Sequence, residues 1–408
     1  MLGHYVKIAF KVLLRRKFFT FISLFAISFT LVVLMMTAAI LDHLFAPMPP
    51  ETKLGRTLGV FHMDMIGPNA QWNGSPGYGF LNKYVRGLSD VEKFSIFAIQ
   101  RQVTSFKDGG EITLNLKRTD GAYWEILEFT FLEGRPITAD DDANGNFVCV
   151  INDATRQRFF GSGSALGKFI DADRQRFRVV GVVSNVPEFR EIAFADVWVP
   201  NSTDPQTSER ERLMGNHAGL LLARDAGDFP NIRNEFRSRL PQVQFTDRDY
   251  DHMSGDAETL FEDRSREILG SADSTLFLAI IIALMLLFMS LPTINLVNIN
   301  VSRILERSSE IGVRKSFGAS SWTLVGQFVV ENLVLTAVGG AVGFLLSEIF
   351  LRTLSDSGLI QYAQFTMNYR IFGYGLLMIL VFGLLSGVYP AWKMSRIHPV
   401  AALKGAPR

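Results

Sequence analysis

Four long apolar stretches constrain this chain more than any other feature of its sequence. Residues 18–41, 274–302 and 371–392 contain no charged side chain, and residues 324–347 are interrupted only by Gln327, Glu331 and Asn332. A helix needs about 20 apolar residues to cross the hydrocarbon core of a bilayer. A buried helix of a water-soluble protein seldom lacks a polar face over that length. The sequence therefore predicts four transmembrane helices.

The first apolar stretch has the features of a retained membrane anchor. Its uncharged run exceeds the roughly 7–15 residues of the apolar core of a signal peptide, and no clear A-x-A cleavage pattern follows it. We therefore expect residues 18–41 to remain in the mature protein.

Basic residues in the short flanks of the four stretches predict the orientation of the chain in the membrane, because Lys and Arg are enriched on the cytoplasmic side. The loop 348–370 contains only Arg352 and Arg370, whereas the other flanks are rich in Lys and Arg. These basic residues are Lys7, Lys11, Arg15, Arg16 and Lys17 before the first stretch, Arg303, Arg307, Arg314 and Lys315 between the second and third, and Lys393, Arg396, Lys404 and Arg408 after the fourth. Both termini and the 303–322 loop are therefore predicted to be cytoplasmic.

The chain is therefore predicted to alternate between membrane and aqueous segments, with one large domain outside the cytoplasm. The predicted segments are a basic N-terminal segment (1–17), helix 1 (18–41), a large extracytoplasmic domain with stalks (42–273), helix 2 (274–302), a cytoplasmic coupling loop (303–322), helix 3 (323–347), an outer loop (348–370), helix 4 (371–392) and a cytoplasmic tail (393–408).

The charge and cysteine content exclude several classes of protein. Lys+Arg number 41 and Asp+Glu 40, so the formal charge of +1 gives no basic field for nucleic acid. Cys149 is the single cysteine, which excludes an intrachain disulfide and a site built from several thiolates.

The sequence predicts that the outer domain is an α+β module, in which two βαβ halves flank a β-rich insertion. The first half combines strands at 57–65 and 91–100 with a helix at 79–87, and the second combines strands at 219–223 and 243–246 with a helix at 229–240.

The insertion, about 106–205, contains the clearest strand pattern of the chain. Residues 111–117 alternate strictly, with Ile112, Leu114 and Leu116 on one face and polar residues on the other. Apolar strands are also expected at 146–151 and 176–183. A charged helical stretch at 257–268 is predicted to be a stalk that leads directly into helix 2.

Two stretches of the outer domain have partial resemblance to ligand-binding motifs. Residues 161–169 approach a phosphate-binding loop, but Ser162 replaces a glycine and Phe169 replaces the Ser or Thr that would bind magnesium. Residues 140–145 match the first half of a calcium loop, but Ile151 stands where the bidentate Glu is required. We expect a turn in the first case and a solvated acidic loop in the second. Because the six histidines are scattered and no nucleophile motif occurs, we predict no catalytic, cofactor-binding or metal-binding residues in this chain.

Small and polar residues inside the apolar stretches predict helix contacts. Gly339, Gly343 and Ser347 share one helix face, as do Gly383 and Gly387, and this spacing permits close approach of two backbones. The partner is either another helix of the same chain or a second copy.

Gln327 and Glu331 lie four residues apart and share a helix face. An intramembrane carboxylate is a candidate functional residue. The alternative is a purely structural role, in which it forms a hydrogen bond near the membrane interface.

The cytoplasmic loop contains an amphipathic helix pattern. Arg303, Arg307, Glu310 and Arg314 recur at helical spacing, and Gly318 suits a helix end. The mixed charge favours docking into a partner protein over binding to lipid headgroups.

Two membrane motifs and several outer segments carry a family resemblance. Residues 310–320, with Gln327 and Glu331, resemble the E-I-G-[IV]-R-[KR] signature of MacB/FtsX-type ABC permeases. Residues 386–403 resemble the closing S-G-x-x-P-A motif of that family, with departures at Met394 and Ala401. Residues 132–136, 150–153, 159–161, 166–168 and 180–183 are similar to the periplasmic core of MacB-like members.

This resemblance implies a one-plus-three arrangement of helices in the bacterial inner membrane and an export function driven from the cytoplasm. It also implies a dimer with a second copy or a related permease, together with a periplasmic adaptor and an outer-membrane channel. The sequence contains no Walker A motif, so ATP and magnesium would be bound by a separate cytoplasmic ATPase. The implied ATPase-coupling residues are Arg303, Arg307, Glu310, Ile311, Arg314, Lys315, Phe317 and Gly318.

Two related functions remain as alternatives to export. One is an FtsX-like scaffold that regulates a periplasmic enzyme, and the other is a permease for lipoprotein release. The outer domain is much longer than in FtsX proteins, which favours the exporter.

Overall fold

The computed structural model describes residues 2–15, 17–205, 211–287, 290, 313 and 321–395. The chain forms two compact units. The helical unit comprises Met1–Asp42, Leu278–Leu359 and Gln364–Arg408, and the sheet unit comprises His43–Phe277 and Ile360–Ala363.

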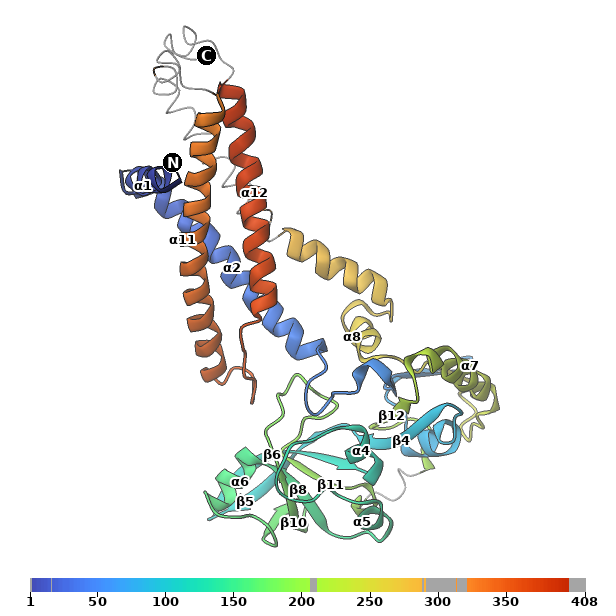
Figure 1. The fold of residues 1–408 in the computed structure, drawn as a ribbon. Helices are drawn as coiled ribbons and strands as arrows, with labels where there is room; N and C mark the ends of the chain where they lie inside the picture. Colours follow the sequence, from blue (N-terminus) through green and yellow to red (C-terminus); the bar gives the residue numbers. More distant parts are fainter. Residues whose placement is uncertain are drawn as a thin grey trace. The chain divides into compact units, whose positions relative to one another are not determined.

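The helical unit is built from the predicted apolar stretches and one additional N-terminal helix. In Figure 1, α11 and α12 lie side by side as long rods. The buried side chains that join the helices are mostly aliphatic: Leu13, Ile27, Leu31, Leu335 and Ile379. The labelled helices are α1 (Leu2–Arg15), α2 (Lys17–Phe45), α11 (Ser321–Asp356) and α12 (Tyr369–Ser395).

Helix α1 has a structure that the basic composition of residues 1–17 did not predict. Lys7, Lys11 and Arg15 recur every fourth residue and are exposed, whereas Ala9 and Leu13 are buried. This amphipathic pattern is typical of a helix that lies in the interface of a membrane.

Two helices of the described residues are long and apolar enough to cross a membrane, namely Lys17–Phe45 and Val329–Asp356. Tyr369–Val381 forms a shorter apolar helix, and a third candidate arises if Leu260–Leu269 and Ser274–Leu287 count as one broken span. The count of four transmembrane helices stays a prediction, because most of residues 288–302 lie outside the described residues.

The sheet unit contains one large and one small sheet. The large sheet runs in the order β1-β12-β4-β6-β11-β8-β10-β7, with β5 on β6 and β9 on β10, and the small sheet has the order β13-β2-β3. Pairs β8–β10 and β6–β11 are parallel and the other pairs are antiparallel. The strands are β1 (Thr57–Val60), β2 (Met63–Ile66), β3 (Gln71–Gly74), β4 (Val91–Ala98), β5 (Arg101–Lys107), β6 (Gly110–Thr119), β7 (Phe131–Gly134), β8 (Val148–Asn152), β9 (Phe169–Ala172), β10 (Gln175–Val183), β11 (Val197–Pro200), β12 (His217–Ala223) and β13 (His252–Gly255).

Three clusters of buried side chains form the core of the sheet unit. One includes Phe80 and Phe236, and another is aromatic, with Tyr123, Trp124 and Trp198. The third lies among the strands of the β-rich middle, where Figure 1 shows β6, β8, β10 and β11 together. The helices of the unit are α3 (Tyr78–Phe80), α4 (Gly121–Ile126), α5 (Ala139–Ala143), α6 (Asp153–Phe160), α7 (Phe229–Arg239) and α8 (Leu260–Leu269).

The two predicted βαβ halves are interleaved in one sheet. Strand β12, from the second half, pairs with both β1 and β4 of the first, with Leu58 opposite Leu221 and Ile96 opposite Gly219. Strands β1 and β4 therefore run in the same direction without touching, because a strand from more than 100 residues later in the chain lies between them.

The last strand of the second half was predicted wrongly. Residues 243–246 form a loop after a short 3-10 turn, and the next strand is β13 in the small sheet. Val243 and Phe245 still contact the core. Their alternation with polar residues reflects this one-sided burial, which does not require a strand.

The predicted strand at 57–65 and the predicted stalk also differ from the structure. The first is divided into β1 and β2, which belong to different sheets. The stalk, helix α8, starts at a capping box of Thr259 and Glu262 and ends at Gly270, whose φ of 73° is left-handed. Because the next apolar helix begins at Ser274, the stalk does not continue directly into the second apolar stretch.

Candidate functional site

The predicted coupling helix lies outside the described residues. This applies to Arg303, Arg307, Glu310, Ile311, Arg314, Lys315, Phe317 and Gly318. Their role stays a prediction from the sequence.

Gln327 and Glu331 are joined by a hydrogen bond within α11. The Gln327 Nε2 donates to Glu331 Oε1 over 2.9 Å, and both side chains are buried. The i,i+4 spacing on a helix brings the two groups together.

The small residues of α11 lie against α2. A Cβ atom at Gly339 would come within 2.7 Å of Ile27 Cγ2, and one at Gly343 would come within 2.8 Å of Leu31 Cδ1. The Ser28 hydroxyl also donates to the Gly339 carbonyl over 3.1 Å. These contacts require glycine on α11, because any side chain would push the two helices apart. Ser347 is also buried on α11, and Gly383 and Gly387 lie within α12.

In the sheet unit, a short loop of residues 189–192, which we call the anchor loop, holds the segment that follows α2. Arg190 Nη1 donates to Glu51 Oε2 over 2.8 Å, and Arg190 Nη2 donates to the Ala46 carbonyl over 2.8 Å. Both side chains of the Arg190–Glu51 pair are 1% exposed. Burial raises the pKa of Glu51 above its usual value, although the charge of Arg190 opposes this shift.

The same anchor loop also holds α8. Arg264 Nη1 donates to Glu191 Oε1 over 3.2 Å and to Glu267 Oε2 over 2.6 Å, and its Nη2 donates to the Phe189 carbonyl over 3.4 Å. The loop therefore joins the segment that begins the sheet unit to the helix near its end.

Lys117 attaches the anchor loop to the large sheet. Its ammonium group donates to the carbonyls of Glu191 and Ile192 from β6, and lies 5.2 Å from the centre of the Phe97 ring. The side chain is fully buried, and burial lowers the pKa of Lys117 to about 7, against the opposing charges of Glu51 and Glu191. The alternation of residues 111–117 placed Lys117 on the polar face of its strand, and the anchor loop covers that face at Lys117.

Three aromatic rings pack where the sheet unit begins and ends. The Phe45 ring at the end of α2 lies 5.0 Å from the Phe261 ring of α8 and 6.2 Å from the Phe277 ring. Such edge contacts add to the burial of apolar area.

A further attachment comes from the segment between α11 and α12. The Tyr362 hydroxyl donates to Asp196 Oδ1 over 3.1 Å, and the Glu188 amide donates to the Gln361 carbonyl over 3.1 Å. Asp196 also accepts hydrogen bonds from Asn115 and Asn152, so its position is fixed by three strands or loops.

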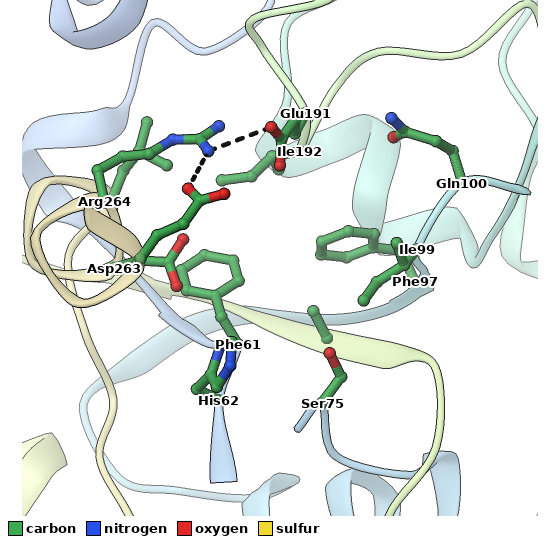
Figure 2. Close-up of a pocket in the computed structure, with 13 residues that line it drawn as sticks. Phe61, His62, Ser75, Phe97, Ile99, Gln100, Glu191, Ile192, Asp263 and Arg264 are labelled. Carbon is green, nitrogen blue, oxygen red and sulfur yellow. Dashed lines mark hydrogen bonds and ion pairs between the residues drawn. The ribbon is translucent and has the colours of Figure 1, made fainter. Parts of the chain in front are cut away.

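A cavity of about 180 Å³, which we call the α8 cavity, lies next to the anchor loop (Figure 2). Its walls combine apolar and charged side chains. Figure 2 shows Arg264 paired with Glu191 on one side, and Phe61, Phe97 and Ile99 around the cavity. The lining residues are Phe61, His62, Ser75, Phe97, Ile99, Gln100, Glu191, Ile192, Ala218, Leu260, Asp263, Arg264 and Glu267.

Both stretches that resemble ligand-binding motifs have structural roles, but the expectation of a solvated acidic loop at 140–145 was wrong in part, because Ala139–Ala143 form α5 and Asp141 is buried. Residues 161–168 form turns between α6 and β9, as expected. Asp141 is held by Arg135 over 2.6 Å and by Thr138 over 2.9 Å, and these bonds lower the pKa of its carboxyl. Across the part of the chain that the structure describes, no three His, Cys, Asp or Glu side chains gather in a way that could hold a metal ion.

Comparison with known protein families identifies both units. Residues 20–239 match the MacB-like periplasmic core domain, and residues 277–399 match the FtsX-like permease C-terminal domain. This chain belongs to the MacB/FtsX-type family of ABC transporter permeases.

Several members of this family have similar sequences. The macrolide export ATP-binding/permease protein MacB of Bdellovibrio bacteriovorus is 28% identical over 69% of this chain and 42% of that protein. The pyoverdine export ATP-binding/permease protein PvdT of Pseudomonas aeruginosa is 27% identical over 68% of this chain and 40% of that protein. The ABC transporter permease YknZ of Bacillus subtilis, described as uncharacterized, is 23% identical over 80% of this chain and 79% of that protein. The chain thus spans about two fifths of the length of its MacB and PvdT relatives.

Among solved structures, the periplasmic region of MacB from Actinobacillus actinomycetemcomitans is 14% identical to this chain. The match has a TM-score of 0.38 and covers 52% of this chain and 92% of that structure.

Sequence reasoning missed the anchor loop, its partners and the α8 cavity. Glu51, Lys117, Arg190 and Arg264 are far apart in the chain, and none belongs to a recognisable motif. The one local signal is Lys117, a charged residue that follows three core positions on a strand.

Proposed function

We propose that this chain is the membrane subunit of a MacB-type ABC transporter that transmits ATP-driven motion to its sheet unit. A separate cytoplasmic ATPase binds ATP and magnesium and docks on the coupling helix predicted at 303–318. The sheet unit lies on the outer side of the inner membrane, where its motion drives export or extraction of a substrate.

The observation that supports this proposal most directly is the anchor loop. Arg190 ties it to the segment after α2, Arg264 ties it to α8, and Lys117 ties it to the large sheet. A displacement of either chain segment would therefore move the sheet rather than only a flexible linker. Buried charged donors such as Arg190 and Lys117 are suited to this, because breaking their hydrogen bonds leaves an uncompensated charge.

The remaining parts of the proposal concern assembly. We propose a dimer with a second copy or a related permease, and contact with a periplasmic adaptor and an outer-membrane channel. Family membership supports the export function that these partners would serve, since its MacB and PvdT members are export proteins by name.

Purification from native membranes in mild detergent, with mass spectrometry of the bound proteins, tests the proposal. We expect the wild type to retain an ABC ATPase and the Arg314→Glu/Phe317→Asp variant to lose it. Arg224→Glu, a charge reversal at an exposed site of the sheet unit, is the matched control and should retain the ATPase.

Three outcomes would contradict the proposal. Absence of an ATPase from the wild type under several gentle conditions would exclude the transporter assembly. Recovery of a cell-wall enzyme in place of an adaptor would favour the FtsX-like scaffold, and a bound lipoprotein would favour lipoprotein release.

A further inference from the structure

The walls of the α8 cavity carry an excess of negative charge. Glu191, Asp263 and Glu267 contribute three carboxyl groups, and Arg264 contributes one guanidinium group. Arg264 is already paired with Glu191 and Glu267, so its charge is balanced within the wall. Of the three carboxyl groups, only that of Asp263 forms no ion pair with Arg264.

The Asp263 side chain accepts no hydrogen bond from any residue that the structure describes. It is half-buried, and Figure 2 shows its carboxylate beside the ring of Phe61. A carboxylate taken partly out of water without a donor is costly. A ligand that brings its own donors and a positive charge would offset that cost.

The remaining walls of the cavity contain the polar side chains of His62, Ser75 and Gln100 and a larger apolar and aromatic part. Phe61 and Phe97 line it, together with Ile99, Ile192 and Leu260. Aromatic faces attract cations. The Phe97 ring already has one ammonium group nearby, that of Lys117 at 5.2 Å.

The size of the cavity limits the ligand. A volume of about 180 Å³ equals that of about six water molecules in the liquid. This is enough to enclose a single ring or a short aliphatic stem.

We propose that the α8 cavity is a binding site for a small organic cation that carries an ammonium group on an apolar stem. The ammonium group pairs with Asp263, and the stem packs between Phe61 and Phe97. This site does not depend on the proposed transport function, since it needs only the folded sheet unit. Its position beside the anchor loop would make the ligand a contact of the element that joins α8 to the sheet.

Ligand-observed NMR on the full chain in detergent, at about pH 8, tests the proposal with three matched probes. Benzylamine is the cation, benzyl alcohol is the neutral analogue and benzoate is the anion. We expect saturation transfer to benzylamine, and weak or absent transfer to the other two.

Two substitutions locate the site. Asp263→Asn should weaken benzylamine binding on the order of tenfold, because a charge-assisted hydrogen bond is lost. Asp171→Asn removes a carboxylate that is 66% exposed on β9, and binding should not change. Asp263→Asn removes no hydrogen bond with a described residue, so the variant should fold.

The proposal fails if benzylamine does not bind the wild type, if benzyl alcohol binds equally well, or if Asp263→Asn binds benzylamine with unchanged affinity. The last two results would show an apolar cavity without selectivity for cations, or binding elsewhere on the chain. Phe61→Leu gives an independent check, because it shortens the apolar wall and leaves Asp263 in place. It should weaken binding of benzylamine while Asp171→Asn does not.

Discussion

At the scale of single residues, the sheet unit is distinguished by charged groups in places where water is scarce. Glu51, Lys117 and Arg190 are almost fully buried, and Arg264 is nearly so. Apolar residues in the same positions often stabilise a fold as much or more, because each charged group loses its hydration shell on burial. They do specify one arrangement of the segments that they join.

Asp263 provides a prediction on pH dependence. Burial raises the pKa of Asp263 to about 7, with Glu258, Glu267 and Glu191 acting in the same direction and Arg264 against it. Because this pKa exceeds that of the unfolded chain, the folded state binds the proton more tightly. The resulting stabilisation is present at low pH and is lost as the pH rises through about 7.

The Asp263→Asn variant does not titrate at this position, so it should gain stability relative to the wild type as the pH rises from about 4 to about 7, and the difference should then stay constant. The difference in melting temperature of the full chain in detergent, measured by intrinsic fluorescence, checks this. The Asp171→Asn control should follow the wild type at every pH. A difference between Asp263→Asn and wild type that stays constant from about pH 4 to about pH 7 would contradict the raised pKa.

At the scale of elements, the contact of α2 with α11 depends on small residues. Gly343 lies so close to α2 that a Cβ atom would be 2.8 Å from Leu31 Cδ1 and 3.2 Å from the Ser28 backbone. In a membrane, such close packing replaces the hydrophobic drive that joins helices in water.

We therefore expect Gly343→Leu to destabilise the helical unit by about 1–3 kcal/mol through overpacking. Gly326→Leu is the matched control on the same helix, because among the described residues no atom outside its own stretch of helix backbone lies within 4 Å of its Cβ position. This control should leave the stability unchanged or raise it, since leucine favours helix more than glycine does. Melting temperatures of the three proteins in the same detergent test the prediction, and an equal loss in both variants would contradict the proposed contact.

The elements also show which strand patterns were informative. The alternation of residues 111–117 correctly predicted a strand, β6, because apolar and polar side chains alternate along a strand that has one face in a core. The pattern at 243–246 is similar and shorter, and it belongs to a loop. Four residues with two apolar side chains contain too little information to separate the two.

At the scale of the whole molecule, the sheet unit has its beginning, its end and the segment between α11 and α12 fastened to its own body. Arg190 and Glu51 fasten the first, Arg264 the second and Tyr362 the third. In the proposed transporter, these attachments are the points where motion would enter the sheet unit.

Substitutions in the Arg190–Glu51 pair can test the stability of the fold separately from the transmission of motion to the sheet unit. Arg190→Met should lower stability by about 3–5 kcal/mol, because it leaves Glu51 buried without a counter-charge. Glu51→Leu/Arg190→Met should recover most of this loss, since an apolar pair can replace a buried ion pair. Both variants lose the hydrogen bond to the Ala46 carbonyl.

We therefore expect the double variant to melt near the wild-type temperature, to retain its ATPase, and to transport poorly in cells. Melting temperature, co-purification of the ATPase and export of a substrate from cells give the three readouts. Normal transport by the double variant would show that the hydrogen bond to Ala46 is not needed to transmit motion.

The sequence by itself determined the features that depend on neighbouring residues. Apolar runs of sufficient length predicted α2 and α11, and alternation predicted β6. The motifs at 310–320 and 386–403 indicated the family to which the chain belongs. Hydropathy and helical periodicity are local properties, so they can be read from short windows.

Only the tertiary structure decided which distant segments meet. The pairing of β12 between β1 and β4, the glycine contact of α11 with α2, and the meeting of Glu51, Lys117, Arg190 and Arg264 at the anchor loop all join residues far apart in the chain. A buried charge is stable only beside its partner, and the local sequence around Arg190 does not predict that this partner is Glu51. For this reason the α8 cavity and its unpaired carboxylate appear only in the folded chain.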